Sequence, residues 1–330
     1  MREQSTECRV QMGIAVECGN PEYIILFSVL CTLFSPSSAA RHSLNSEGAM
    51  EMGLWVADGE RGLMLATGAG CRRVGPPGEA LCRTCGRIWC AGAGRCRCYA
   101  EATGEFLCGM ELPTGVCAMT ALDHQVYALS ADADSVTAFC AETGEIRCCA
   151  PAGMYPRDVC AHPGGKFFLV AGGASGEMLL LDAALRRLKT YRLPGTVCGA
   201  CFLGRGMAAL CAVERGEALA SRLYAVSFRG VTEEMLALPL APGCLCSLPD
   251  GGCAVGCCGE TVCFRANKKA AFRQPFSCPL RLRAARGQIL LCEAGEGVFS
   301  LPSGRRVYAG ANALDALPVR LCSRREETGK

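Results

Sequence analysis

The chain has 330 residues, half of them hydrophobic and a fifth charged, with a formal net charge of +3. This composition is that of a globular protein and excludes wholesale disorder. Acidic and basic residues are interspersed without a basic stripe, so the sequence offers no electrostatic support for a nucleic-acid partner, and we expect none. Gly is frequent and aromatic residues are sparse, which favours many short strands joined by tight turns.

Residues 1–50 differ from the rest of the chain. Tyr23–Phe34 is an uncharged apolar run, but a membrane span needs about 20 such residues, so we predict none. The run has the length of a signal-peptide core, with residues 37–40 as a cleavage region. Its preceding flank carries four Glu against two Arg, however, which is atypical of a signal. We favour a disordered or non-native leader. The alternatives are export by a signal peptide and a true start at Met50 or Met52.

Residues 51–322 contain a unit of about 40 residues that repeats. Each unit has a Pro or Gly corner and short apolar segments separated by turns. The turn between the third and fourth segments recurs at Gly68, Gly104, Gly144, Ala184, Arg229, Asn267 and Gly304. A second series, the Pro corners, has a similar spacing: Pro77, Pro113, Pro151, Pro194, Pro242 and Pro275. Such a period indicates a repeat architecture, and seven turns indicate seven units.

Each unit offers four segments of about five residues whose alternation is blurred toward continuous apolarity, as in strands buried on both faces. Four-stranded units in a radial array are propeller blades. A helical solenoid would require longer periodic segments without so many Gly and Pro, and a β-sandwich would not keep so regular a period. We therefore predict an all-β, seven-bladed β-propeller of four-stranded blades, followed by a polar tail at residues 323–330.

The termini of the repeat region are complementary. The first unit has only three strand segments, at residues 54–58, 63–67 and 71–74, whereas Ala316–Cys322 remains spare after the last unit. We predict that this spare segment supplies the missing strand of the first blade. Such pairing closes the ring and removes exposed strand edges that would invite aggregation.

Cysteine is unusually frequent, at 27 residues, and an odd count cannot pair completely within one chain. Many cysteines occupy strand positions, as Cys96 and Cys98 do, and a free Cys behaves as a small hydrophobe. We interpret most of them as core residues of a cytoplasmic protein. Cys82 and Cys85 form a CxxC pair, but the nearby cysteines lack the spacing of a second zinc pair and no helix follows. We therefore predict no metal and no cofactor.

The segment 155–173 reads Tyr-Pro-Arg-Asp-Val-Cys-Ala-His-Pro-Gly-Gly-Lys-Phe-Phe-Leu-Val-Ala-Gly-Gly. It resembles the blade signature of the YVTN-type and lactonase-like seven-bladed propellers, in which Pro-Arg is followed by His-Pro-Asp-Gly-Lys and an apolar strand. The resemblance covers about 280 residues in degenerate form and implies the same fold. It says less about activity, because many propellers are binding platforms.

In the lactonase branch the resemblance implies an Arg, a His and a Glu around the top of the central channel. Arg157 matches the Arg, but Asp158 stands where the His is expected and Gly172–Gly173 where the Glu is expected. Lactone hydrolysis needs a general base beside a water and a cation for the developing oxyanion. Arg157 and Asp158 are the candidate catalytic residues. His162 is a further ligand-binding candidate, and its alternative role is to shape its hairpin.

Two function classes remain. The favoured class is a non-enzymatic propeller that binds a protein or a small molecule at the channel mouth, with Arg157, Asp158 and His162 as the ligand-binding candidates. The alternative is a lactonase-like hydrolase acting at the same mouth. The first is preferred because two of the three expected catalytic positions differ. We expect a monomer whose functional face bears the Pro corners and the turns between the second and third strands.

Overall fold

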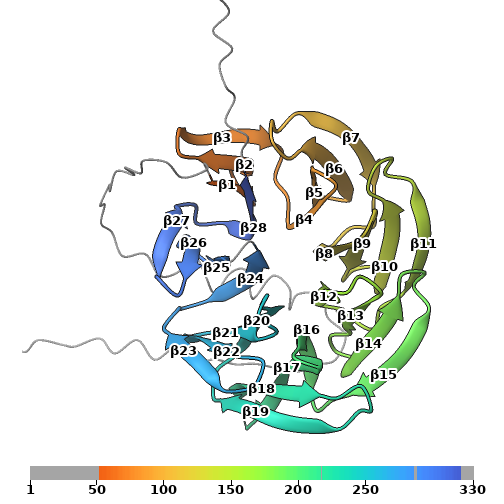
Figure 1. Cartoon of the computed structure of the whole chain (residues 1–330), viewed down its shortest axis with the longest axis vertical. Helices are drawn as coiled ribbons and strands as arrows, with labels where there is room; N and C mark the ends of the chain where they lie inside the picture. Colours follow the sequence, from red (N-terminus) through yellow and green to blue (C-terminus); the bar gives the residue numbers. More distant parts are fainter. Residues whose placement is uncertain (1–51, 217, 286–287, 321–330) are drawn as a thin grey trace, which may run out of the picture. The chain divides into compact units, whose positions relative to one another are not determined.

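Short apolar segments separated by Gly-containing turns form strands throughout the chain. The computed structural model describes residues 52–216, 218–285 and 288–320. These residues form 28 strands in seven antiparallel four-stranded sheets, arranged as blades around a central axis (Figure 1). We call the region along this axis, between the innermost strands, the channel. The predicted seven-bladed β-propeller is confirmed. Among the described residues, no helix has the length and apolarity that crossing a membrane requires.

Within each blade, the four strands follow one another from the channel outward. Blade 1 comprises β28 (Ala313–Arg320), β1 (Met52–Asp58), β2 (Gly62–Thr67) and β3 (Gly70–Gly75). Blade 2 comprises β4 (Ala80–Thr84), β5 (Arg87–Gly92), β6 (Arg95–Ala100) and β7 (Phe106–Glu111). Blade 3 comprises β8 (Val116–Leu122), β9 (Gln125–Ser130), β10 (Ser135–Cys140) and β11 (Ile146–Pro151). Blade 4 comprises β12 (Asp158–Ala161), β13 (Phe167–Ala171), β14 (Glu177–Asp182) and β15 (Arg187–Arg192).

The remaining three blades follow the same order. Blade 5 comprises β16 (Thr196–Leu203), β17 (Gly206–Arg215), β18 (Ala218–Val226) and β19 (Thr232–Leu238). Blade 6 comprises β20 (Pro242–Ser247), β21 (Cys253–Cys257), β22 (Glu260–Phe264) and β23 (Ala270–Gln274). Blade 7 comprises β24 (Pro279–Ala285), β25 (Gln288–Glu293), β26 (Gly297–Leu301) and β27 (Arg305–Tyr308).

All seven predicted turns fall between the third and fourth strands of their blades. Gly104, Gly144 and Gly304 share one geometry there, with φ of 74°, 76° and 67°. In each of these turns the Gly N–H donates to the carbonyl four residues earlier, at 2.9 Å. A left-handed backbone favours Gly, which explains why this position marks the repeat in the sequence.

The ring closes through the strand pairing that the sequence predicted. β28 runs antiparallel to β1, with Trp55 opposite Leu317 and Met52 opposite Arg320. The innermost strand of the first blade therefore comes from the far end of the propeller region. The strand begins at Ala313, slightly earlier than the predicted segment.

The apolar core is divided into seven clusters, one between each pair of neighbouring blades. Between blades 2 and 3, the Trp89 ring meets Phe139 edge to face at 5.0 Å, and between blades 3 and 4 Tyr127 lies 4.5 Å from Phe168. All four rings are fully buried. Burying one such side chain contributes about 1.5–3 kcal/mol, so the blades are held face to face by apolar packing.

None of the 23 cysteines in the described residues forms a disulfide. Eleven are buried, among them Cys96 and Cys98, while the others are half-buried or exposed. The prediction that most are core residues is thus right for about half. Cys82 packs in the core between blades 2 and 3 whereas Cys85 is exposed, so the CxxC pair does not converge. Within the described ranges, no group of His, Cys, Asp or Glu has the arrangement of a metal site.

The predictions for the leader at residues 1–50, including its signal-like segment 23–34, and for the tail at residues 323–330 lie outside the described residues.

Candidate functional site

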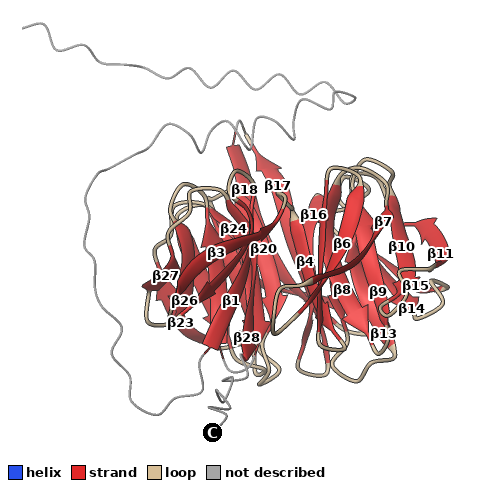
Figure 2. Ribbon diagram, turned by 90° about the horizontal axis from the view of Figure 1, so that it is seen from above, coloured by secondary structure: helices blue, strands red, loops and turns tan. Residues whose placement is uncertain are grey.

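The two faces of the ring differ in what reaches the channel. Each innermost strand begins where the link from the preceding blade arrives, and the turn between second and third strands returns to that same side. We call this side the linker face; it is the face that the sequence analysis predicted to be functional. The turns between first and second strands, and between third and fourth strands, lie on the opposite face. Figure 2 shows the loops gathered at these two sides of the strands.

Arg157 and Asp158 lie at the linker face, where β12 begins. Arg157 is exposed, and its backbone N–H donates to the Ala171 carbonyl at 2.9 Å. Asp158 is the first residue of the strand, and only 14% of its side chain is exposed. The two residues therefore differ: one cation is open to solvent at the mouth, while the carboxylate beside it is inside.

His162 lies in the turn after β12, at the other end of the strand and on the opposite face. At about 3.3 Å per residue it is about 13 Å along the chain from Asp158. Its Nδ1 accepts a hydrogen bond from the Gly164 N–H at 2.9 Å, and its ring packs against Phe167 and Phe202 at 4.4 and 4.7 Å. The structure thus does not bring His162 to the other two candidates, and the contacts of His162 shape its hairpin.

Arg281, on β24 across the channel, is a site residue that the sequence analysis missed. Its Nη1 donates to Asp158 Oδ1 at 3.2 Å, and its Nη2 donates to the Cys117 carbonyl on β8. One side chain therefore joins blade 7 to blades 3 and 4. The Arg281 Nε is buried without a hydrogen-bond partner.

Arg283, one level deeper, joins blade 7 to blades 1 and 2. Being two residues along the same strand, it projects to the same side as Arg281. Its Nε and Nη2 donate to the two carboxylate oxygens of Asp315 at 2.9 and 2.7 Å, and Nη2 also donates to the Leu81 carbonyl at 3.0 Å. Asp315, on β28, is fully buried and accepts backbone N–H groups from Leu81 and Ala316, each at 2.9 Å. This carboxylate is therefore fully engaged.

The two carboxylates have opposite pKa shifts. Burial raises the pKa of Asp158 to about 6, because the desolvation of its carboxylate outweighs the attraction of Arg281 and Arg283. Burial alone would also raise the pKa of Asp315, but the charge and paired hydrogen bonds of Arg283 outweigh it, so this pKa is lowered. Of the two, Asp158 is the group able to exchange a proton near neutral pH.

Thiols on the innermost strands surround these ion pairs. Burial raises the pKa of Cys117 and of Cys160 to about 11. The Cys117 sulfur donates to the Pro156 carbonyl at 3.3 Å, and the Cys160 sulfur lies 3.4 Å from Ser247 Oγ. Because the thiolate is the nucleophilic form, these two cysteines are unreactive at neutral pH. The available chemistry here is that of Arg and Asp.

A Cys–His contact occurs on the opposite face. The Cys85 sulfur lies 3.3 Å from His124 Nδ1, and Glu142 Oε1 lies 3.6 Å from the same nitrogen. The side chain of His124 is 74% exposed. In a nucleophile relay the two partners of a His contact different ring nitrogens. Here both contact Nδ1, so the cluster lacks that arrangement.

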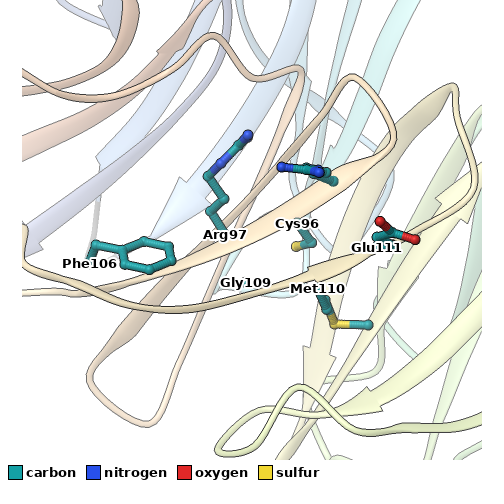
Figure 3. A pocket seen from close by; sticks show the side chains of 7 residues that line it. Cys96, Arg97, Phe106, Gly109, Met110 and Glu111 are labelled. Atoms are coloured by element: carbon teal, nitrogen blue, oxygen red, sulfur yellow. The ribbon is translucent and has the colours of Figure 1, made fainter.

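Two shallow hollows lie away from the channel. One, of about 330 Å³, is on the outer strands β6 and β7 of blade 2; Figure 3 shows Arg97, Phe106 and Glu111 along it. The other, of about 290 Å³, is lined by residues of blades 5 and 6, including Arg205, Glu233 and Lys268. The four residues Asp158, Arg281, Arg283 and Asp315 form the channel cluster. Neither hollow is lined by any of them.

No family model matches the chain. No curated protein matches its sequence. The structure is similar to that of a "putative 6-phosphogluconolactonase" from Bacteroides uniformis, with a TM-score of 0.64 and 11% identity over 82% of this chain and 100% of that one.

Two other structures match with similar TM-scores and coverage. A "putative 6-phosphogluconolactonase" from Bacteroides fragilis matches with a TM-score of 0.62 and 10% identity, over 83% of this chain and 99% of that one. The WD40 repeats of RRP9 match with a TM-score of 0.60 and 11% identity, over 81% and 89%. The likeness is one of fold. Propellers of different kinds match about equally well, so the site has to be interpreted from its own residues.

Proposed function

We propose that this propeller is a non-enzymatic binding protein whose ligand docks on the linker face, over the channel mouth. The supporting observation is that Arg281 crosses the channel to Asp158 and to the Cys117 carbonyl. The carboxylate that would act as a base is thereby already held by a guanidinium. Arg157 is left as the exposed cation beside it.

The ligand in this proposal is a protein or a small molecule that presents an anionic group to Arg157. Guanidinium–anion contacts are charge-assisted and stronger than neutral hydrogen bonds. Arg281 crosses the channel and Arg283 projects into it one level deeper, which favours binding at the mouth over binding deep inside. Links from all the blades converge there, as at many binding sites on rigid scaffolds. We propose that the protein binds as a monomer.

Thermal unfolding in the presence of anions tests the proposal. Citrate, inorganic phosphate and a short Glu-rich peptide are titrated against the wild type, Arg157→Ala and Arg305→Ala. Arg305 is also an exposed arginine, but it lies on the outer strand β27. A ligand that binds the folded state raises Tm with concentration. We expect one of these probes to raise Tm in the wild type and in Arg305→Ala but not in Arg157→Ala. Equal responses of all three proteins would contradict the proposal.

The alternative is that the chain, which resembles the lactonase-like propellers in the sequence of residues 155–173, is also a lactone hydrolase. The observation that favours it is the raised pKa of Asp158, about 6, beside the Arg281 guanidinium. Asp158 would take a proton from a water molecule while the oxygen of that water bonds to the lactone carbonyl carbon. An arginine would stabilise the oxyanion that forms. The ring C–O bond would then break, and the leaving alkoxide would take the proton from Asp158.

A panel of five- and six-membered lactones decides between the two functions. For a binding protein we expect ring opening at the rate in buffer alone. Hydrolysis by the wild type that is lost in both Arg157→Ala and Asp158→Asn would replace the binding proposal with the hydrolase. Folding of each variant is checked by its thermal transition.

We also propose a reducing, cytoplasmic location for the chain, with export as the alternative. The support is that eleven cysteines are buried thiols within the described ranges. Thiol titration in denaturant, on protein purified without reductant from its native source, should give close to 27 thiols per chain. A count lower by several pairs would favour export.

A further inference from the structure

Two cysteines meet on the linker face between blades 6 and 7. Cys258 lies in the turn between β21 and β22, and Cys278 lies in the link that precedes β24. The backbone between them is joined, because the Gly259 N–H donates to the carbonyls of Phe276 and Ser277 at 2.8 and 3.1 Å. The Cys278 thiol is hydrogen-bonded to the Cys258 sulfur. Two segments from different blades thus place their thiols in contact.

The backbone on both sides of this contact is anchored. The Cys258 N–H donates to the Ala241 carbonyl at 2.9 Å, and the Cys278 carbonyl accepts from the Ala294 N–H at 3.0 Å. The buried Glu293 carboxylate accepts the N–H of Ser277. The fold therefore fixes the backbone positions of both cysteines next to each other.

The environment of Cys258 differs from that of its neighbour. The hydrogen bond from Cys278 stabilises the Cys258 thiolate and lowers its pKa to about 7, whereas burial raises the pKa of Cys257 to about 11. Cys258 is therefore more readily ionised at neutral pH than Cys257, which stays a thiol. Cys258 and Cys278 are both half-buried, within reach of a small oxidant. A low-pKa, accessible thiolate beside a second thiol is the arrangement of redox-sensing cysteines.

We propose that Cys258 and Cys278 form an oxidation site that closes to a disulfide on reaction with hydrogen peroxide. The Cys258 sulfur attacks a peroxide oxygen, the O–O bond breaks, and a sulfenic acid and water result. The Cys278 sulfur then attacks the Cys258 sulfur, the S–O bond breaks, and the released oxygen leaves as a second water. The two thiols lose two electrons in total, and one peroxide is reduced to two waters.

The position of this disulfide couples it to the channel. Cys278 is followed directly by Pro279, the first residue of β24, and Arg281 is on the same strand. Pro279 is closely packed, since a Cβ added at Gly256 would lie 2.6 Å from its side chain. A covalent link at Cys278 fixes the start of the strand that carries both channel arginines. The oxidation site itself stands whether or not the proposed ligand binding does.

Peptide mapping of the full-length protein tests the proposal. Protein is treated with peroxide, remaining thiols are alkylated, and tryptic peptides are analysed by mass spectrometry. Residues 274–281 form a tryptic peptide in which Cys278 is the only cysteine, and residues 230–265 form the peptide that contains Cys258. We expect a disulfide-linked pair of these two peptides that increases with peroxide and disappears on reduction.

Variants identify the partner within the larger peptide. Cys258→Ser should abolish the link, whereas the matched control Cys257→Ser should keep it. Cys278→Ser should stop the reaction at the Cys258 sulfenic acid, which dimedone traps. Should the link persist in Cys258→Ser, or should the wild type give no link while other cysteines oxidise, the proposal is wrong. The wild-type result is decisive even if a variant does not fold.

Discussion

Arg281 and Arg283 project from the same side of β24 into the same channel, yet their ion pairs differ. Arg283 holds both oxygens of a fully buried Asp315, which also accepts two backbone N–H groups. Arg281 reaches Asp158 through one contact at 3.2 Å and keeps a buried Nε without a partner. A buried ion pair is favourable only when further hydrogen bonds complete it. We infer that the Arg283–Asp315 pair is a structural clamp, that is, an ion pair that stabilises the fold. The Arg281–Asp158 pair can exchange its contacts more easily.

The largest expected effect comes from removing the charge of the deeper pair. Asp315→Asn leaves the Arg283 guanidinium buried without its counter-ion, and breaking a buried pair in this way costs about 3–5 kcal/mol. We expect the free energy of unfolding in urea to fall by that amount. The control is Glu296→Gln, which breaks the exposed Arg306–Glu296 pair and should cost less than about 1 kcal/mol. Equal losses would show that the channel pair is not a clamp.

Lysine substitutions compare the two arginines directly. Lysine keeps the positive charge but cannot donate from a planar fork to two carboxylate oxygens. Arg283→Lys should therefore cost about 2 kcal/mol, because it loses charged hydrogen bonds worth about 1.5–3 kcal/mol. Arg281→Lys should cost about half as much. Midpoints of thermal unfolding measure both, and the reverse order would assign the clamp to Arg281.

The two carboxylates should also give opposite pH dependence. The pKa of Asp158 is raised from 3.8 to about 6 on folding, so the folded state binds more protons between these values. Its contribution to stability therefore falls as pH rises from about 4 to 6, by at most about 3 kcal/mol at 1.36 kcal/mol per pKa unit.

Asp315, with its lowered pKa, should lose its contribution only as pH falls below about 4. The urea midpoint of the wild type is compared with that of Asp158→Asn across this range. The difference should shift in favour of the variant as pH rises from 4 to 6. A constant difference would mean that folding leaves the pKa of Asp158 unchanged.

The smallest effect is expected at Arg157. Its side chain is exposed, and a surface substitution away from a cap or a buried network changes stability by less than about 0.5 kcal/mol. Arg157→Ala should therefore unfold in urea as the wild type does. A loss above about 1 kcal/mol would mean that Arg157 belongs to the buried network.

The sequence predicted the architecture because its signals are local. A Gly with positive φ marks the same turn in several blades, and Gly104 and Gly144 are visible without any structure. The closing strand was also predictable, since one unit lacked a strand and a spare segment followed the last. Both patterns are recognised from short stretches of sequence and their spacing, so they can be found without a structure.

The channel cluster depends on contacts across the ring. Arg281 and Cys117 are 164 positions apart, and the repeat pattern places their blades on opposite sides of the ring without indicating which side chains reach across it. One signal was present: Arg281 and Arg283 place two charges on alternate positions of an otherwise apolar strand, and charges that become buried need partners. His162 was grouped with Arg157 because both belong to the segment that resembles the blade signature, but the strand between them separates the two faces.

The strand β28 also gives the fold an order in time. β1 is among the first described strands to leave the ribosome, and the strand that pairs with its inner edge is the last of them. Until then that edge is unpaired, and Arg283 has no Asp315 to neutralise it. Because Asp315 is on β28, one event seals the ring and supplies the missing counter-ion. A nascent ring without β28 therefore has an unpaired strand edge at β1 and an Arg283 guanidinium without its counter-ion.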